Sequence, residues 1–235
     1  MVRRGASANT SIATRIILSK RIDLAGIYDK LYEFYGPQSW WPARTRFEVI
    51  VGAILTQNTS WENVKKALAN LKKAKALSPG RIKKINERHL ASLIRPSGYY
   101  NLKAKRLKNF TTFLDSKYDL SLNRAASCKT ARLRQELLGV SGIGPETADS
   151  ILLYAFNRPV FVIDAYTKRI FSRHKVLDKN ADYEEMQDFF MANLPKNVKL
   201  YNEYHALIVR LCKELCKARP QCRLCPLEKH KITCK

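Results

Sequence analysis

The chain has 235 residues, with 43 Lys and Arg against 20 Asp and Glu, a formal net charge of +23, and 46% hydrophobic residues. This hydrophobic fraction excludes a disordered chain, and the length is sufficient for one large domain or two small ones. No apolar run approaches the ~20 residues needed to span a bilayer, so we expect a soluble protein with no membrane partner. The charge excess indicates a polyanionic partner, most often nucleic acid, although ribosomal proteins and proteins that bind acidic membranes share it.

The N-terminal segment, residues 1–20, contains Arg3, Arg4, Arg15 and Lys20 and no acidic residue. We expect it to be a basic flexible arm. It lacks the long apolar core of a secretion signal, which predicts an intracellular protein in the cytoplasm or associated with the nucleoid. A basic segment of this kind is also compatible with an organellar presequence, and this alternative stays open.

Apolar residues recur at helical spacing along the rest of the chain, and alternating strand-like runs are scarce. The segments with this spacing are 24–35, 61–71, 107–114, 148–155, 186–190 and 204–211. Gly and Pro residues separate these segments, as expected between helices. The pattern predicts an all-α fold.

Positive charge is concentrated between residues 63 and 114, which include 14 Lys and Arg and a single acidic residue, Glu87. Each basic group taken alone can be a solvated helix face. For the whole block we favour a surface that faces phosphates, because like charges at this density repel one another unless a polyanion relieves them.

A glycine-rich segment follows, in which Gly139 ends one helical pattern and Gly142 and Gly144 precede Pro145. Proline is favoured at the first position of a helix, and glycines let the backbone turn sharply and approach a ligand closely. The N–H groups at the start of the next helix are suited to a phosphate. An ordinary corner between two helices is the alternative, but the two glycines on either side of Ile143 favour phosphate binding.

Asp164 follows four apolar residues, 160–163, at the start of a helical segment. From residue type alone it is an N-cap, worth about 1 kcal/mol. A functional acid is the alternative, and one carboxylate can serve both purposes.

Cysteines gather at the C-terminus, where five of the six fall within the last 24 residues. We expect Cys216, Cys222, Cys225 and Cys234 to bind a metal centre, because an intracellular chain is poorly suited to disulfides. Four thiolates can hold zinc or a [4Fe–4S] cluster. A single C-x-x-C pair favours the cluster, and Cys212 is expected to be a buried helix residue.

The order of glycine hairpin, aspartate and cysteine-rich C-terminus resembles the helix-hairpin-helix DNA glycosylase superfamily, and endonuclease III in particular. The similarity extends over roughly residues 22–234. Three segments look like the 3-methyladenine DNA glycosylase III branch of this superfamily: Trp40-Trp41-Pro42, residues 53–59 and residues 95–107.

The resemblance implies two helical domains with a DNA-binding cleft, one a helical barrel of residues 45–158 that contains the hairpin. The other would combine residues 21–44 with 159–235 and the [4Fe–4S] cluster loop. Asp164 matches the family's essential aspartate, which supports rupture of the N-glycosidic bond. Gln57 matches the residue that fills the gap left by an extruded nucleotide.

The resemblance also assigns residues to DNA binding and to the pocket for the base. The expected DNA-binding residues are Gly139, Val140, Gly142, Ile143, Gly144, Lys103, Lys105 and Arg106. The expected pocket residues are Gln57, Trp40, Trp41, Trp61 and Glu146. Electron-rich indole rings suit a cationic base such as 3-methyladenine, although an isolated tryptophan is more often a core residue.

Glu146 marks a departure from endonuclease III, because bifunctional relatives carry a lysine at this position that attacks the sugar. A carboxylate cannot form a Schiff base, which predicts a monofunctional glycosylase unless another lysine, such as Lys168, substitutes. The expected partner is double-stranded DNA containing damaged bases, and the expected state is a monomer. The alternatives are an endonuclease III-type glycosylase and AP lyase acting on oxidised pyrimidines, and a non-catalytic DNA-binding protein. The four histidines show no ligand spacing, and no role is assigned to them.

Overall fold

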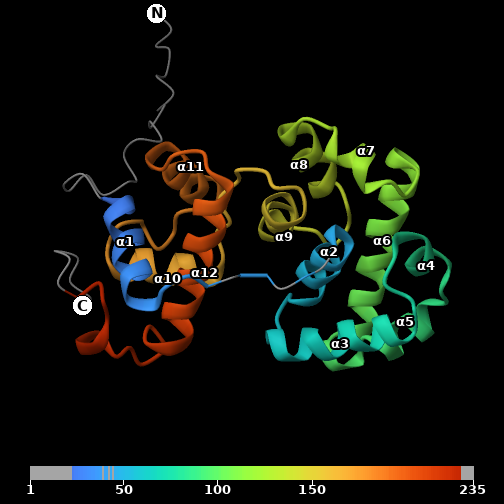
Figure 1. The fold of residues 1–235 in the computed structure, drawn as a ribbon, viewed down its shortest axis with the longest axis horizontal. Coiled ribbons are helices and arrows are strands. Elements are labelled where there is room, and N and C mark those ends of the chain that lie inside the picture. The colour runs from blue at the N-terminus through green and yellow to red at the C-terminus, as the bar shows by residue number, and fades with distance from the viewer. Residues whose placement is uncertain (1–22, 39, 42, 44, 229–235) are drawn as a thin grey trace, which may run out of the picture. The chain divides into compact units, whose positions relative to one another are not determined.

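The computed structural model describes residues 23–38, 40, 41, 43 and 45–228. The expected basic arm and Cys234 lie outside these residues. Helices account for all the regular secondary structure of the described part, which confirms the all-α prediction (Figure 1). None of the described helices is long and apolar enough to cross a membrane.

The chain divides into two compact units. Unit 1 comprises residues 1–38, 163–195 and 204–235, and unit 2 comprises residues 39–162 and 196–203. These bounds differ from the expected domains at residues 39–44, 159–162 and 196–203, which group with unit 2.

Unit 2 is built around α2 and α6, against which the shorter helices pack. Its helices are α2 (Arg46–Leu55), α3 (Trp61–Lys73), α4 (Pro79–Lys84), α5 (Glu87–Leu93), η2 (Arg95–Ser97), α6 (Tyr100–Tyr118), α7 (Leu122–Ala126), α8 (Thr130–Leu138), α9 (Pro145–Ser150) and the π-helical η3 (Ile151–Ala155). Every residue of α2 except Arg46 is buried, and this helix forms the centre of the unit's core.

Local sequence explains where these helices begin. The side chains of Thr45, Ser60 and Ser78 accept hydrogen bonds from the first-turn N–H groups of α2, α3 and α4. Such caps satisfy donors that have no partner within the helix.

Unit 1 contains α1 (Leu24–Tyr35), α10 (Ala165–Arg173), α11 (Tyr183–Asn193), most of α12 (Val198–Glu214) and the short η4 (Cys222–Leu224). Asp182 and Glu185 form a reciprocal capping box at the start of α11. The buried Tyr204 hydroxyl of α12 donates to the carbonyl of Leu24 at 3.0 Å, which fixes α12 against α1. The α12 helix is therefore held against α1 within the core of unit 1.

Candidate functional site

The glycine-rich segment of unit 2 forms a hairpin, which we define as α8, the loop 139–144 and α9. Pro145 is the first residue of α9, as the sequence predicts. Gly142 adopts φ +92°, a conformation that favours glycine, and an added Cβ would lie 2.4 Å from Cγ of Arg106. Gly144 has open space around it. The loop therefore requires glycine at 142 both for its backbone conformation and for close packing.

Two side chains from outside the hairpin brace its loop. Gln57 Nε2 donates to the carbonyl of Gly142 at 3.1 Å and to Thr147 Oγ1 at 2.9 Å. Arg106 Nη1 in turn donates to Gln57 Oε1. Gln57, expected to enter a DNA duplex, is thus half-buried and bound to the hairpin in this structure.

The hairpin loop exposes backbone and buries its apolar side chains. Val140 and Ile143 are 7% and 4% exposed, so their side chains belong to the core and only their backbone lies near the surface. Gly142 and Gly144 are exposed, and within the described residues neither N–H has a backbone acceptor. Glu146 is exposed in the first turn of α9. The exposed surface of this loop is therefore mostly main chain, which is suited to hydrogen bonding with an anion.

A buried ion pair joins the two helices of the hairpin. Arg134 on α8 donates from Nε and Nη2 to the two carboxylate oxygens of Asp149 on α9, at 2.8 and 3.0 Å. The Asp149 side chain is fully buried and that of Arg134 is 17% exposed. A bidentate pair fixes the relative orientation of two planar groups and hence of the helices that carry them.

Lys103 requires a correction to the expected set of phosphate contacts. Its side chain is buried, with the residue 1% exposed, and Nζ donates to the carbonyls of Leu55 and Ser97 at 2.9 and 2.7 Å. Burial, together with the charge of Arg106, lowers the pKa of Lys103 to about 8. Lys103 therefore stabilises the end of α2 from inside unit 2. Lys105, on the same helix, is exposed as expected of a phosphate contact.

The three tryptophans form an aromatic cluster with Tyr154 of η3. Trp41 stacks on Tyr154 with ring centroids 4.8 Å apart and lies edge-to-face with Trp61 at 5.3 Å. Trp40 contacts Trp41 at 6.5 Å. Tyr154 was not among the expected pocket residues, because its position within an apolar run gives no sign of a ring partner.

Trp41 differs from an ordinary core residue. It is half-buried and has φ +68°, which is unusual for a residue other than glycine. Its buried Nε1 has no hydrogen-bond partner among the described residues. A buried indole N–H normally finds an acceptor, so this donor is suited to a ligand that brings one.

In unit 1, Asp164 is the N-cap of α10. Its Oδ1 accepts from the N–H of Thr167 at 2.7 Å and from Thr167 Oγ1 at 2.8 Å. Its Oδ2 lies 3.3 Å from Nε2 of His205 on α12. The capping role expected from the sequence is confirmed, and the second oxygen has a separate interaction.

The pKa of Asp164 reflects a balance of opposing effects. Burial acts to raise this pKa, whereas the contact with His205 and the two bonds from Thr167 lower it, and the net direction is downward. The side chains of Asp164 and His205 are only 10% and 7% exposed. Asp164 is therefore held as a carboxylate. His205, to which the sequence analysis assigned no role, is its neighbour, and only the folded structure reveals the contact.

Of the described cysteines in the C-terminal segment, Cys216 lies beside two arginines of α10. Arg173 Nη1 lies 3.3 Å from the sulfur of Cys216, and Arg169 Nη1 donates to the Cys216 carbonyl at 3.2 Å. A hydrogen bond from the Cys212 thiol and the charge of Arg173 lower the pKa of Cys216 to about 6, against the effect of burial. Cys212 is buried, as expected. Cys216 is thus readily available as a thiolate, the form that binds metals.

Within the described residues, no three His, Cys, Asp or Glu side chains converge closely enough to hold a metal ion. The residue chemistry is nevertheless that of a sulfur-liganded centre. The hydroxyl of Tyr35 is buried without a partner in the described structure, and its pKa is raised by burial and by the charges of Glu214 and Cys225. A buried hydroxyl donor near Cys225 is compatible with a sulfur-liganded metal centre at this position.

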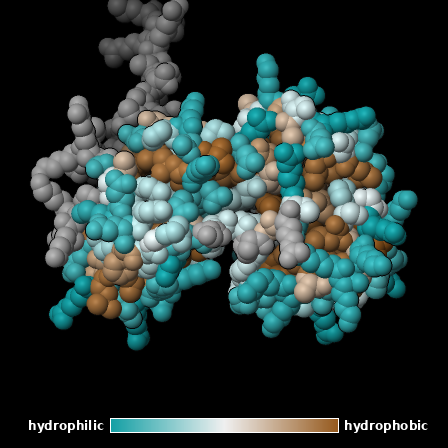
Figure 2. All heavy atoms as spheres, in the orientation of Figure 1, coloured by the Kyte–Doolittle hydropathy of each residue, from teal (hydrophilic) through white to brown (hydrophobic). Residues whose placement is uncertain are grey.

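Much of the positive charge of unit 2 lies on its shorter helices. Lys65, Lys66, Lys72 and Lys73 of α3 are exposed, and within the described part of the chain Lys65 and Lys72 alone among them pair with carboxylates, those of Glu62 and Glu48. Figure 2 shows hydrophilic side chains over most of the visible face of this unit. The expected block is therefore largely at the surface, with Lys103 as the exception.

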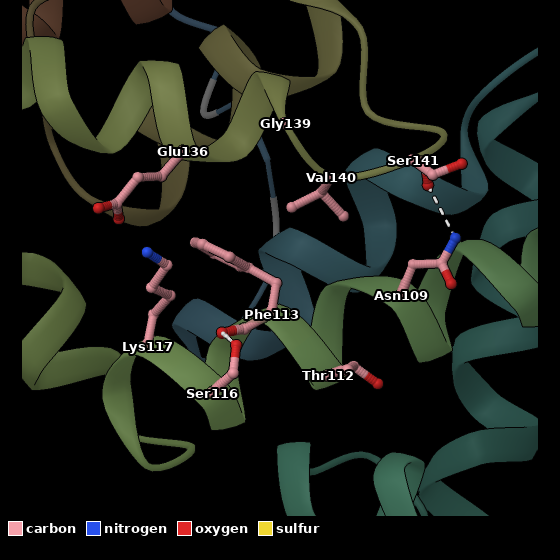
Figure 3. Close-up of a pocket in the computed structure, with 9 residues that line it drawn as sticks. All are labelled: Asn109, Thr112, Phe113, Ser116, Lys117, Glu136, Gly139, Val140 and Ser141. Atoms are coloured by element: carbon pink, nitrogen blue, oxygen red, sulfur yellow. Dashed lines mark hydrogen bonds between the residues drawn. The ribbon is translucent and has the colours of Figure 1, made fainter.

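A groove of about 490 Å³ lies between α6 and the end of α8 (Figure 3). Asn109 Nδ2 donates to the carbonyl of Ser141 at one end, Lys117 and Glu136 face each other at the other, and Phe113 lies between. The groove contains none of the expected site residues except Gly139 and Val140.

Comparison with known proteins extends these observations. Residues 51–196 match the family model described as "HhH-GPD superfamily base excision DNA repair protein". A protein of Methanocaldococcus jannaschii named "Putative DNA repair glycosylase" is 53% identical over 203 residues, which cover 86% of this chain and 92% of that protein.

Two solved structures are similar to this chain. The Helicobacter pylori 3-methyladenine DNA glycosylase MagIII bound to 1,N6-ethenoadenine has a TM-score of 0.70 and 32% identity, covering 82% of this chain and 98% of that one. A non-covalent endonuclease III–DNA complex has a TM-score of 0.74 at 23% identity, covering 86% and 91%. The second likeness concerns the fold alone.

Proposed function

Because the chain belongs to the HhH-GPD superfamily of base excision DNA repair proteins, we propose that it is a DNA glycosylase that hydrolyses the N-glycosidic bond of a damaged base, with Asp164 as its catalytic carboxylate. The observation that carries this proposal is the nearly buried Asp164 carboxylate, whose Oδ2 lies 3.3 Å from Nε2 of His205. A carboxylate that only caps a helix uses one oxygen, whereas Asp164 also has a second oxygen held against His205.

The reaction follows from this carboxylate. The C1′–N bond breaks, its electron pair leaves with the base, and positive charge develops on the sugar. An ionised Asp164 stabilises that charge and accepts a proton from the water that attacks C1′. The products are the free base, protonated where needed by solvent, and an abasic site. Extrusion of the nucleotide must come first, because the reacting atoms are inaccessible inside the duplex.

We infer that the aromatic cluster receives the extruded base, and that this base is an alkylated purine such as 3-methyladenine. Stacked indole and phenol rings attract a cationic base through their π-faces. The Nε1 of Trp41, which has no acceptor among the described residues, offers a hydrogen bond as well. The relative from Helicobacter pylori, which is named a 3-methyladenine DNA glycosylase, supports this substrate class.

DNA binding is assigned to the exposed main chain of the hairpin loop, with Lys105 and Arg106 contributing charge. Backbone N–H groups at Gly142 and Gly144 would bind a phosphate without regard to sequence. Gln57 would leave its brace on the hairpin to fill the gap in the duplex. Binding should therefore weaken steeply with salt, as it does for proteins that displace counterions.

We propose that the enzyme is monofunctional, because Glu146 occupies the position of the lysine in bifunctional relatives. The competing assignment is an endonuclease III-type glycosylase and lyase, favoured by an endonuclease III of Sulfolobus acidocaldarius that is 32% identical over 184 residues. Borohydride treatment on damaged DNA distinguishes the two. No covalent adduct is expected, and a trapped adduct would establish a lysine nucleophile, with Lys168 the first residue to substitute.

We further propose that Cys216, Cys222, Cys225 and Cys234 hold a [4Fe–4S] cluster. When bound, such a cluster would cross-link the C-terminal segment to the end of α12. Arg173 offsets the negative charge of the thiolates through its contact with Cys216. Anaerobically purified protein should be brown with broad visible absorbance, whereas a colourless protein containing zinc would support the alternative metal.

The central experiment is a panel of duplexes, each with one lesion, incubated with the wild type and with Asp164→Asn and scored before and after alkali. Base release without strand scission appears as cleavage that depends on alkali. Asp164→Asn should abolish release and retain DNA binding. Release that persists in this variant would refute the assigned role of Asp164, and binding without release of any base would favour a non-catalytic DNA-binding protein.

A further inference from the structure

His205 and Asp164 come from different helices, α12 and α10, and meet in the interior of unit 1. The distance between His205 Nε2 and Asp164 Oδ2 is 3.3 Å. The residue before His205, Tyr204, is buried and donates to the carbonyl of Leu24, so the position of this part of α12 is fixed. A fixed imidazole beside a carboxylate restricts the orientation of that carboxylate.

Helix capping does not account for this contact. Oδ1 of Asp164 already accepts from both the N–H and the hydroxyl of Thr167, which completes the cap. The other oxygen is free of the helix terminus and faces His205. A histidine that is 6% exposed loses much of its hydration, and contact with a carboxylate offsets that loss.

We propose that His205 is a positioning residue for catalysis, which fixes the orientation of Oδ2 of Asp164. This inference rests on the proposed function of Asp164. His205 acts through Asp164 and is assigned no contact with substrate. The arrangement is comparable to any pair in which a buried partner fixes the rotamer and protonation state of the reacting group.

The other groups described near Asp164 do not take the place of His205 in orienting its carboxylate. Cys212, also on α12, has a pKa raised by its hydrogen bond with Cys216 and by burial, and the charge of Asp164 adds to the increase. Its thiol therefore stays neutral. On the side of α11, the Tyr183 hydroxyl lies 3.4 Å from the N–H of Ile163, the residue before Asp164. Of the groups that lower the pKa of Asp164, His205 is the one on another helix.

The test compares two substitutions at His205 in the full-length protein. His205→Gln keeps a polar side chain with an N–H donor, and His205→Leu removes it. His174→Gln is the matched control, since His174 is another buried histidine of unit 1, at the end of α10. For each protein we would measure thermal unfolding, affinity for a lesion-bearing duplex, and the single-turnover rate of base release between pH 4 and pH 9.

His205→Leu should slow base release at neutral pH by about tenfold to a hundredfold, the effect of a misplaced reacting group, while the dissociation constant for DNA stays the same. His205→Gln should recover part of that rate. In both variants the acidic limb of the rate profile should move to higher pH, because the contact with His205 is one of those that lower the pKa of Asp164. The control should match the wild type in rate and profile.

Different results would contradict the proposed function and the proposed role of His205. If the wild type releases no base from any duplex, the proposed function itself fails. If the wild type is active and Asp164→Asn is inactive, the inference about His205 is overturned by a folded His205→Leu that keeps the wild-type rate and acidic limb. It is equally overturned if His174→Gln reproduces the same loss, or if His205→Gln is no faster than His205→Leu.

Discussion

The buried pair between Arg134 and Asp149 gives a quantitative test of how the hairpin is held. Substitution Arg134→Met leaves the fully buried Asp149 carboxylate without its guanidinium partner. An uncompensated buried charge costs about 3–5 kcal/mol, and we expect the free energy of unfolding of unit 2 to fall by this amount. Asp149→Leu should cost less, because the Arg134 side chain that remains is 17% exposed and can reach water.

The double variant Arg134→Met with Asp149→Leu should recover most of the lost stability, since apolar groups of similar volume can replace a buried ion pair. Arg132→Met is the control. Arg132 lies on the same helix and pairs with Glu136 at 3.1 Å, but its side chain is 73% exposed, so no measurable change is expected.

Urea unfolding monitored by tryptophan fluorescence measures this effect directly, because all three tryptophans of the chain lie in unit 2. The midpoint should shift while the slope with urea stays constant. The reasoning is refuted if Arg134→Met lies within about 1 kcal/mol of the wild type, or if the double variant is as unstable as Arg134→Met alone.

Three further outcomes are expected. Gly142→Ala should destabilise unit 2 by at least about 1 kcal/mol in the same assay, because φ is +92° and a Cβ would lie 2.4 Å from a side-chain carbon of Arg106. Gly144→Ala should leave the stability unchanged, because there is open space around Gly144. The pKa of Lys103 is about 8 in the folded protein and 10.5 in its ordinary state, so between these pH values the unfolded chain binds more protons than the folded one. The stability of the wild type relative to Lys103→Met should therefore rise with pH over this range, by about 1.4 kcal/mol per pH unit. Equal dependence of stability on pH in the two proteins would contradict the burial of Lys103. Lys105→Ala should weaken duplex binding about equally for all sequences and reduce the slope of log affinity against log salt by ~1, whereas an unchanged slope would remove Lys105 from the interface.

Local sequence patterns predicted the elements that have one buried face or a marked terminus. The helix of Pro145 and the cap at Asp164 both follow from residue types that act on their own backbone. By contrast, α2 lacks a helical pattern because it is buried on nearly all sides, and its residues are almost uniformly apolar.

The residues whose role was not predicted, or was predicted wrongly, are those whose neighbours come from distant parts of the chain. Lys103 lies within a basic block and looks like a surface residue, yet its side chain reaches two carbonyls inside unit 2. His205 has no ligand spacing, because its partner Asp164 is on another helix. Tyr154 stacks on Trp41 only after residues far apart in sequence have packed together. Charge and spacing cannot reveal such contacts, whereas a cap or a turn is encoded within a few residues.

The hydrogen bonds that hold Gln57 against the hairpin loop affect the proposed extrusion of a base. If Gln57 enters the duplex, its two bonds to Gly142 and Thr147 and the one from Arg106 must be exchanged for others. Each such bond contributes about 0.5–1.5 kcal/mol, so the exchange opposes insertion unless contacts with DNA replace them. A base that is already poorly stacked or paired costs less to extrude, which leaves more binding energy to offset this exchange. The hydrogen bonds of Gln57 to the hairpin therefore favour extrusion of damaged bases over intact ones, before any group in the aromatic cluster has contacted the base.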